Sequence, residues 1–203
     1  MAALLLVTMI FAGCGGSDSA SSDGKSYKRN CPVPLSALRY LHVLHKNLRG
    51  EVLEGELICN EKIAASLIEI FKQLYTENYP IEKIRLIDEY DADDELSMRD
   101  NNSSCFNFRY VSFTNRISLH GYGLAVDINP LYNPYIKTVD GKKIIAPDNS
   151  ADFEDRTKDF PYKITEDDLC CRLFAEHGFK WGGRDLSAEL DYQHFFIEAG
   201  IER

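Results

Sequence analysis

Ser118-Leu-His120-Gly-Tyr-Gly-Leu-Ala-Val-Asp127-Ile-Asn-Pro130 is the stretch that organises this sequence, because it brings two polar side chains into one short motif. His120 precedes Asp127 by seven residues, and glycines stand at positions 121 and 123. Glycine permits a sharp turn after the imidazole, and the chain can then enter a strand that carries the carboxylate. The alternation of apolar residues from 124 to 128 places Asp127 on the other, open face of that strand. An imidazole and a carboxylate joined in this way supply two of the three protein ligands that a catalytic zinc ion needs.

A second polar motif, Asp191-Tyr-Gln-His194, lies near the other end of the chain. His194 offers a further imidazole, and Asp191 stands three residues before it, close enough to contact a water molecule on the same metal. The sequence therefore predicts His120, Asp127 and His194 as zinc ligands and Asp191 as the catalytic base.

Together the two motifs resemble the zinc peptidases of bacterial cell-wall peptides, which include the VanX and VanY type D-alanyl-D-alanine peptidases and phage L-alanyl-D-glutamate endopeptidases. The family pattern is Ser-x-His-x-x-Gly-x-Ala-x-Asp, followed far downstream by Glu or Asp three residues before a His. Every fixed position is filled here, by Ser118, His120, Gly123, Ala125, Asp127, Asp191 and His194. The resemblance covers roughly residues 81–198 and implies a zinc-dependent peptidase that hydrolyses peptidoglycan stem peptides.

Arg109 is the candidate for binding a substrate carboxylate or steadying the oxyanion. Alternation over 106, 108 and 110 directs residues 107 and 109 to the opposite face, toward Asp127. An arginine upstream of the His-Asp motif has this role in the resembling family, and Arg109 best fits that place, with Arg99 and Arg116 as competitors. The alternative is a surface arginine paired with one of the many carboxylates.

Three further residues are candidates for substrate binding. Ser118 begins the family pattern, and Tyr132 and Tyr135 lie in the irregular stretch after Asp127, where a long segment next to a site is often a binding loop. The two tyrosines can line a peptide groove or simply pack on the body of the domain.

Periodicity predicts a mixture of helices and strands, and the resemblance implies an α+β domain in which a small, mainly antiparallel sheet carries the zinc site and helices pack against it. We expect helices over 34–49 and after Asn60, a bulged or edge strand over 81–88 and a solvated acidic loop over 88–100. A hairpin is expected at Asp140-Gly141, and a capping box at 165–168 begins a helix that ends at His177-Gly178.

The N-terminal residues have the form of a secretion signal. Residues 1–13 are almost entirely apolar and too short to span a bilayer, and small residues precede Cys14, as in a bacterial lipoprotein signal. No Lys or Arg precedes the apolar run, so we expect the true start to lie upstream of Met1; the alternative is a cytoplasmic chain with an apolar start. Residues 14–28 read as a flexible tether and 29–203 as the peptidase domain, held outside the cytoplasm by a lipid on Cys14.

Charge and cysteine content narrow the partners. A formal net charge of −9 without a basic run argues against nucleic acid and against electrostatic docking on anionic lipid. Five cysteines remain beside Cys14, and this odd number allows at most two disulfides in an oxidising compartment. We expect one of the adjacent Cys170 and Cys171 to be buried and the other exposed or bridged; the remaining three are Cys31, Cys59 and Cys105.

These observations favour a D-Ala-D-Ala-type carboxypeptidase, with an L-alanyl-D-glutamate endopeptidase as the alternative bond specificity. A non-catalytic zinc-binding module of the same fold, as in the signalling domain of Hedgehog proteins, is the alternative from another class. Asp191 disfavours it, because a structural site does not need a base beside a ligand. A metal-free acid–base pair acting on wall sugars lacks the paired carboxylates of such chemistry.

Overall fold

The computed structural model describes residues 25–111, 114–186 and 189–198. The α-helices within these ranges are α1 Glu61–Thr76, α2 Asp94–Arg99, α3 Leu169–Glu176 and α4 Gly182–Asp185. The strands are β1 Leu38–Lys46, β2 Val52–Asn60, β3 Lys83–Ile84, β4 Asn102–Ser103, β5 Ala125–Asp127, β6 Tyr135–Val139, β7 Lys142–Ala146, β8 Lys180–Trp181, β9 Leu190–Asp191 and β10 His194–Phe196. Short 3-10 helices, η1 Leu35–Ala37, η2 Ile87–Tyr90, η3 Leu119–Tyr122 and η4 Ala151–Phe153, complete this α+β fold.

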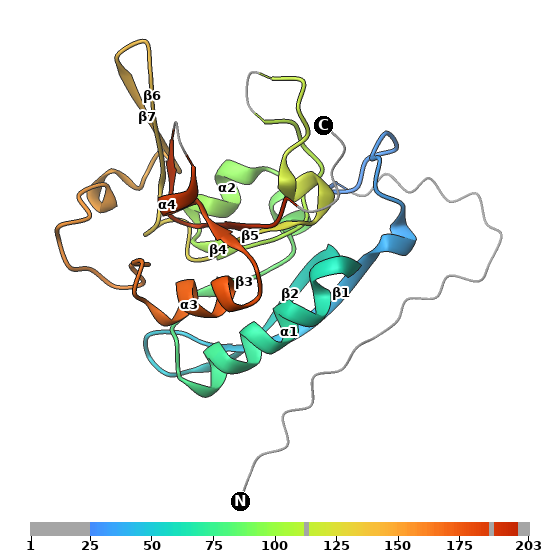
Figure 1. The fold of residues 1–203 in the computed structure, drawn as a ribbon, viewed down its shortest axis with the longest axis horizontal. Helices are drawn as coiled ribbons and strands as arrows, with labels where there is room; N and C mark the ends of the chain where they lie inside the picture. The colour runs from blue at the N-terminus through green and yellow to red at the C-terminus, as the bar shows by residue number, and fades with distance from the viewer. Residues whose placement is uncertain (1–24, 112–113, 187–188, 199–203) are drawn as a thin grey trace, which may run out of the picture.

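β1 and β2 form a long antiparallel pair on which α1 packs (Figure 1). The predicted helix over 34–49 is therefore wrong. Leu41, Val43 and His45 are buried at every second position, which is the period of a strand. Leucines at 38, 41, 44 and 48 also fit a helical spacing, and pairing with β2 along all nine residues decides for the strand.

The helix predicted after Asn60 is confirmed as α1. The Asn60 side chain accepts a hydrogen bond from the backbone N–H of Lys62 at 3.1 Å and so satisfies a free donor of the first turn. Its predicted apolar face is buried, through Ile63, Leu67, Ile70, Phe71 and Leu74. The same core includes residues from β5 and α3, so α1 ties the first half of the chain to the second.

Two small antiparallel sheets carry the polar motifs. In the first, β10 lies between β5 and β8, and His194 stands directly opposite Asp127. In the second, β6 lies between β7 and β9, and Tyr135 stands opposite Asp191. The turn predicted at Asp140-Gly141 is confirmed: both residues have positive φ, as the tight turn between β6 and β7 requires.

Two predictions between α1 and β5 need correction. The strand expected over 81–88 is reduced to β3, which pairs in parallel with β4. The acidic stretch over 88–100, expected as a solvated loop, contains η2 and α2. Asp93 caps α2 by accepting a hydrogen bond from the backbone N–H of Leu96, so the acidic residues begin a helix there instead of remaining in a loop.

The tether was predicted to end at Lys28, but residues 25–28 already pack on the domain. Ser26 is buried and its backbone N–H donates to Asp88 Oδ1 at 3.0 Å, while the ring of Tyr27 stacks on Phe106. Residues 1–24, with the predicted signal and Cys14, lie outside the described residues. In the described ranges no helix combines the length and apolar character needed to cross a membrane.

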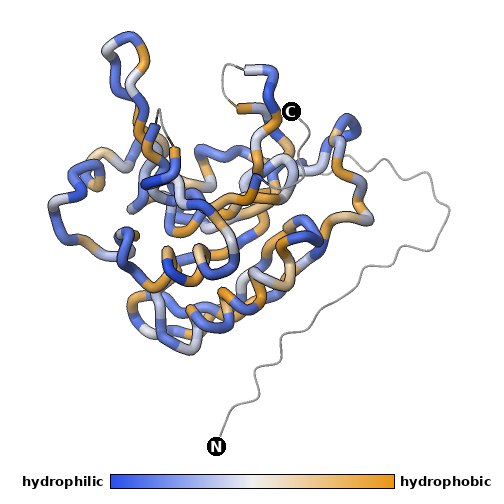
Figure 2. The backbone as a smooth tube through the Cα atoms, viewed as in Figure 1, coloured by the Kyte–Doolittle hydropathy of each residue, from blue (hydrophilic) through white to orange (hydrophobic). Residues whose placement is uncertain are grey.

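Apolar residues concentrate along the central strands and α1 (Figure 2).

The five described cysteines, Cys31, Cys59, Cys105, Cys170 and Cys171, are all free thiols. Cys170 and Cys171 are both buried, so the expectation that one is exposed or bridged is wrong. Both lie in the first turn of α3, where each packs into the core.

The helix predicted from the capping box at 165–168 begins later than the motif suggests. Asp168, not Thr165, caps α3, because its carboxylate accepts from the backbone N–H of Cys170 and Cys171. The predicted end is confirmed: His177 is the C-terminal cap, and Gly178 follows with φ +83°.

Candidate metal centre

His120 is held in place by a one-turn 3-10 helix, η3. Ser118 caps it: its hydroxyl oxygen accepts from the backbone N–H of His120 at 3.3 Å. Gly123 ends it with φ +66°, and a Cβ at this position would lie 2.7 Å from the backbone nitrogen of Asn60. The turn therefore needs glycine here for both its conformation and its close approach to β2.

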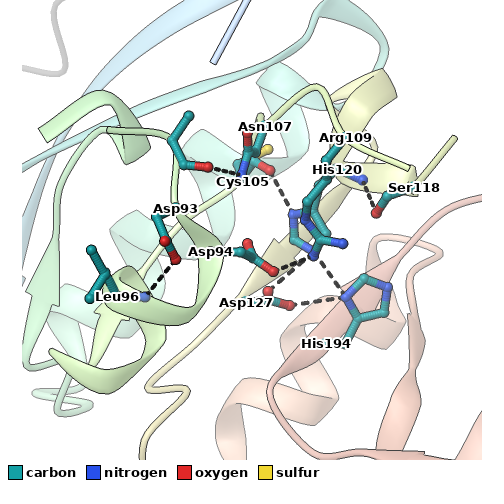
Figure 3. A network of polar contacts seen from close by, with 11 residues as sticks. Asp93, Asp94, Leu96, Cys105, Asn107, Arg109, Ser118, His120, Asp127 and His194 are labelled. Atoms are coloured by element: carbon teal, nitrogen blue, oxygen red, sulfur yellow. Dashed lines mark hydrogen bonds and ion pairs between the residues drawn. The ribbon is translucent and has the colours of Figure 1, made fainter. Parts of the chain in front are cut away.

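His120, Asp127 and His194 converge (Figure 3). Each offers one possible ligand atom, and these three atoms all lie within 4.8 Å of one another. His120 Nε2 is 3.2 Å from Asp127 Oδ2, and His194 Nδ1 is 2.9 Å from Asp127 Oδ1. The two imidazole nitrogens are 3.1 Å apart. The β5–β10 register produces this arrangement, because it sets His194 directly across from Asp127.

The hydrogen bonding of His120 favours a metal ligand. Its Nδ1 lies 2.6 Å from the backbone carbonyl oxygen of Cys105, which can only accept, so Nδ1 carries the proton. In the neutral imidazole Nε2 then presents a lone pair toward Asp127 and His194. A backbone carbonyl that accepts from the other ring nitrogen is a usual partner of a metal-ligating histidine. Two imidazoles and a carboxylate are the donor set of a catalytic zinc site, so these residues fit the predicted ion.

Asp127 is buried, which corrects the prediction that it lies on an open face. Burial alone would raise the pKa of Asp127, but His120 and His194 outweigh it and hold that pKa well below its usual range. For His120 burial acts in the other sense and would lower the pKa, but the negative charge of Asp127 outweighs burial and raises that pKa. The carboxylate thus stays ionised in the interior, as a metal ligand must be.

Asp191 lies at the end of β9, half-buried, and its Oδ1 is enclosed without a hydrogen-bond partner among the described residues. Burial raises the pKa of Asp191 to about 7; the positive charge of His194 opposes that rise, and the negative charge of Asp127 adds to it. A carboxyl group with this pKa near a metal cluster can both take up and release a proton at neutral pH.

Arg109 stands beside His120, and its Nη2 pairs with Asp94 Oδ2 at 2.6 Å (Figure 3). It is thus paired with a carboxylate, as the alternative interpretation supposed, but this pair lies beside the cluster and not on the outer surface. Its Nε is buried without an acceptor among the described residues. The competitors are less suitable: Arg99 pairs with Asp148 at 3.2 Å on the surface, and Arg116 is exposed.

The predicted substrate-binding residues occupy different places. Ser118 is buried and caps η3. Tyr132 packs its ring on Phe153 and Tyr162, at 4.5 and 5.1 Å between centroids, which is the alternative of packing on the body. Tyr135 alone adjoins a predicted catalytic residue, because it stands opposite Asp191 in the β6–β9 register.

Two contributors to the site were missed from the sequence. The Cys105 carbonyl is a backbone group, so no side-chain pattern marks it. Asp94 belongs to a run of acidic residues that reads as solvated, and only the folding of α2 turns it toward Arg109.

Unpartnered polar atoms gather in the same region. Of the buried side-chain atoms without a partner in the described chain, four belong to residues of the two segments that flank the site, namely Asn107 Oδ1, Arg109 Nε, Asp191 Oδ1 and Gln193 Oε1. Buried polar groups are nearly always satisfied, so such a concentration points to a polar ligand or to water.

Residues 112–197 match a family model. That family is described as D-alanyl-D-alanine carboxypeptidase. The match includes His120, Asp127, Asp191 and His194 and leaves out the segment with Asp94 and Arg109. No curated protein and no solved structure gives a match. The matched region supports a carboxypeptidase-like peptidase, and the cluster within it is able to bind a metal.

Proposed function

We propose that this protein is a zinc-dependent carboxypeptidase that removes the terminal D-alanine from peptidoglycan stem peptides. The observation that carries the proposal is the convergence of His120, Asp127 and His194 inside a region that matches a D-alanyl-D-alanine carboxypeptidase family. Asp191, three residues before His194, adds a proton-accepting group that a purely structural site does not need.

The roles of the residues follow from their surroundings. Zinc held by His120, Asp127 and His194 would polarise the scissile carbonyl and lower the pKa of water. Asp191 Oδ1 takes the proton of the attacking water and returns it to the leaving amine, for which a pKa of about 7 is suited. The Arg109 guanidinium binds the carboxylate of the substrate or the developing oxyanion.

The substrate and location in this proposal rest on the sequence. Stem peptides end in free carboxylates that a guanidinium can recognise, and they lie outside the cytoplasm. We place the domain outside the cytoplasm, held to a membrane by a lipid on Cys14. If this is so, the Cys14→Ser variant is released to the soluble fraction. L-alanyl-D-glutamate endopeptidase activity is the second candidate, because the same catalytic groups hydrolyse either bond.

The decisive experiment measures metal content and reaction products together. Purified wild type is expected to contain about one zinc per chain, and mass spectrometry of muropeptides after incubation is expected to show loss of D-alanine. His194→Ala should lose both the zinc and the activity, and chelation should abolish wild-type activity. His177→Ala is the matched control, because it removes an imidazole at the C-terminal cap of α3.

Each other result has a definite meaning. Cleavage after L-alanine identifies the endopeptidase. Zinc bound with no product from any muropeptide supports the non-catalytic binding module. A wild type that binds no zinc overturns the proposal.

A further inference from the structure

The β6–β7 hairpin continues the sheet that carries Asp191, and strand register decides which of its side chains share a face with that residue. Tyr135 pairs with Asp191, and alternation puts Lys137 and Val139 on the same side. Across the hairpin, Ile144 is opposite Lys137 and Lys142 is opposite Val139, so both join this face.

Contacts near the base of the hairpin confirm the register. The Tyr135 hydroxyl donates to Glu189 Oε2 at 2.7 Å, and Lys137 Nζ lies 2.9 Å from the same oxygen. Glu189 precedes β9, and these two contacts place its carboxylate beside Tyr135 and Lys137. One continuous surface thus runs from Asp191 past Glu189 and Tyr135 to the outer part of the hairpin.

The outer part of this surface is open and carries a free cation. Val139 and Ile144 are 41% and 40% exposed. Lys143, on the opposite face, pairs with Glu154, whereas Lys142 pairs with no residue that the structure describes. The hairpin projects from the body of the domain and carries both hydrophilic and apolar residues (Figures 1 and 2).

We propose that this face binds the part of a carboxylate-bearing stem peptide on the N-terminal side of the scissile bond. The face is formed by Tyr135, Lys137, Val139, Lys142 and Ile144. The proposal rests on the proposed function. It is supported by continuity with Asp191 and by charge. In a chain of net charge −9 this face carries Lys142, which has no partner among the described residues, and Lys137, which shares Glu189 with Tyr135, so the face suits an anionic peptide. Val139 and Ile144 would cover the apolar parts of the peptide.

Length makes the proposal specific. A strand rises about 3.3 Å per residue, so Val139 lies about 13 Å along β6 from Tyr135. An extended dipeptide spans about 7 Å at most, and a pentapeptide spans about 17 Å. Ile144 is opposite Lys137, about 7 Å along the strand from Tyr135, and Lys142 is opposite Val139, about 13 Å along it. A dipeptide at the catalytic site therefore does not extend past Ile144 to Lys142, whereas a full stem peptide does.

The test compares the two faces of one strand with two substrates. Lys142→Ser/Ile144→Ser alters the proposed face, and Lys143→Ser/Ile145→Ser alters the neighbouring residues on the other face. For a stem pentapeptide, the first variant is expected to raise KM about tenfold with kcat unchanged. Its kcat/KM for D-alanyl-D-alanine should stay at the wild-type value, and the second variant should resemble wild type with both substrates.

Equal KM values for the two variants would overturn the proposal. So would a loss with the dipeptide as large as with the pentapeptide, because the hairpin would then act by positioning Asp191. If wild type cleaves neither substrate, the proposed function fails by itself. Calorimetric binding of the pentapeptide to the same three proteins then decides the inference: weaker binding by the first variant alone supports it, and equal binding refutes it.

Discussion

The β1–β2–α1 unit and the region 112–197 are built in different ways. The first consists of two nine-residue strands and a 16-residue helix, whose apolar residues form much of the core. The second has strands of two to five residues, short helices and long connections, and it contains His120, Asp127, Asp191 and His194. Regular elements supply burial in the first region, and turns and short strands place polar groups in the second.

The difference does not divide the site from the scaffold. The carbonyl of Cys105 and the guanidinium of Arg109 lie outside the matched region and complete the site within it. The backbone of Asn60, just before α1, donates to the carbonyl of Gly123 at 2.9 Å. Residues before position 112 therefore fix the positions of groups that the region 112–197 supplies.

The largest effect expected from one substitution is on activity, at Asp191. Asp191→Asn removes the proton acceptor and should lower kcat by about 10²- to 10⁴-fold. Zinc content should be unchanged, because the three ligands remain. Steady-state kinetics and metal analysis of the same preparation measure both quantities. Asp152→Asn, an exposed carboxylate of η4, serves as the control. An Asp191→Asn protein with wild-type kcat would mean that Asp191 only supports the fold.

A core substitution in the first region should have the opposite profile. Phe71 is almost fully buried on α1, and Phe71→Ala is expected to lower the free energy of unfolding by about 3–5 kcal/mol. Because Phe71 belongs to the apolar core and is not a candidate ligand, kcat per folded molecule should remain near wild type. Denaturant unfolding and activity at low temperature measure the two effects, with the exposed neighbour Lys72→Ala as control. A folded Phe71→Ala protein without activity would show that the two regions are coupled more tightly than their contacts indicate.

The sequence named the three candidate ligands that converge but not the strand β1 of the first region. The three-residue spacing of Leu38, Leu41 and Leu44 fits a helix and not a strand. Pairing with β2, which the local sequence does not record, makes this segment a strand. α1 was predicted correctly because its cap and its apolar spacing are both local.

At the site, local patterns named the side chains but not their environment. The family pattern named His120, Asp127 and His194, which the structure brings together. It did not show that Asp127 is buried, since that burial depends on β10 on one side and on the bridge to Ser104 on the other. Nor did it show that Tyr132 packs on other aromatic rings. The pairing of Asp94 with Arg109 depends on where α2 docks, which no spacing in the sequence records.

The Asp94–Arg109 pair gives the smallest predicted effect and the sharpest test of whether residues before position 112 contribute to the chemistry. Asp94 and Arg109 are both largely shielded from solvent, so their ion pair restrains the guanidinium beside His120. Asp94→Asn should lower kcat/KM about fivefold, in line with about 1 kcal/mol for a partly shielded ion pair. Asp93→Asn is the matched control. Asp93 caps α2 by accepting from the backbone N–H of Leu96, and asparagine can accept the same hydrogen bond. In an Arg109→Lys background the Asp94 substitution should have little further effect, since its action passes through the guanidinium. Additive losses in that double variant would instead assign Asp94 a role of its own at the metal centre.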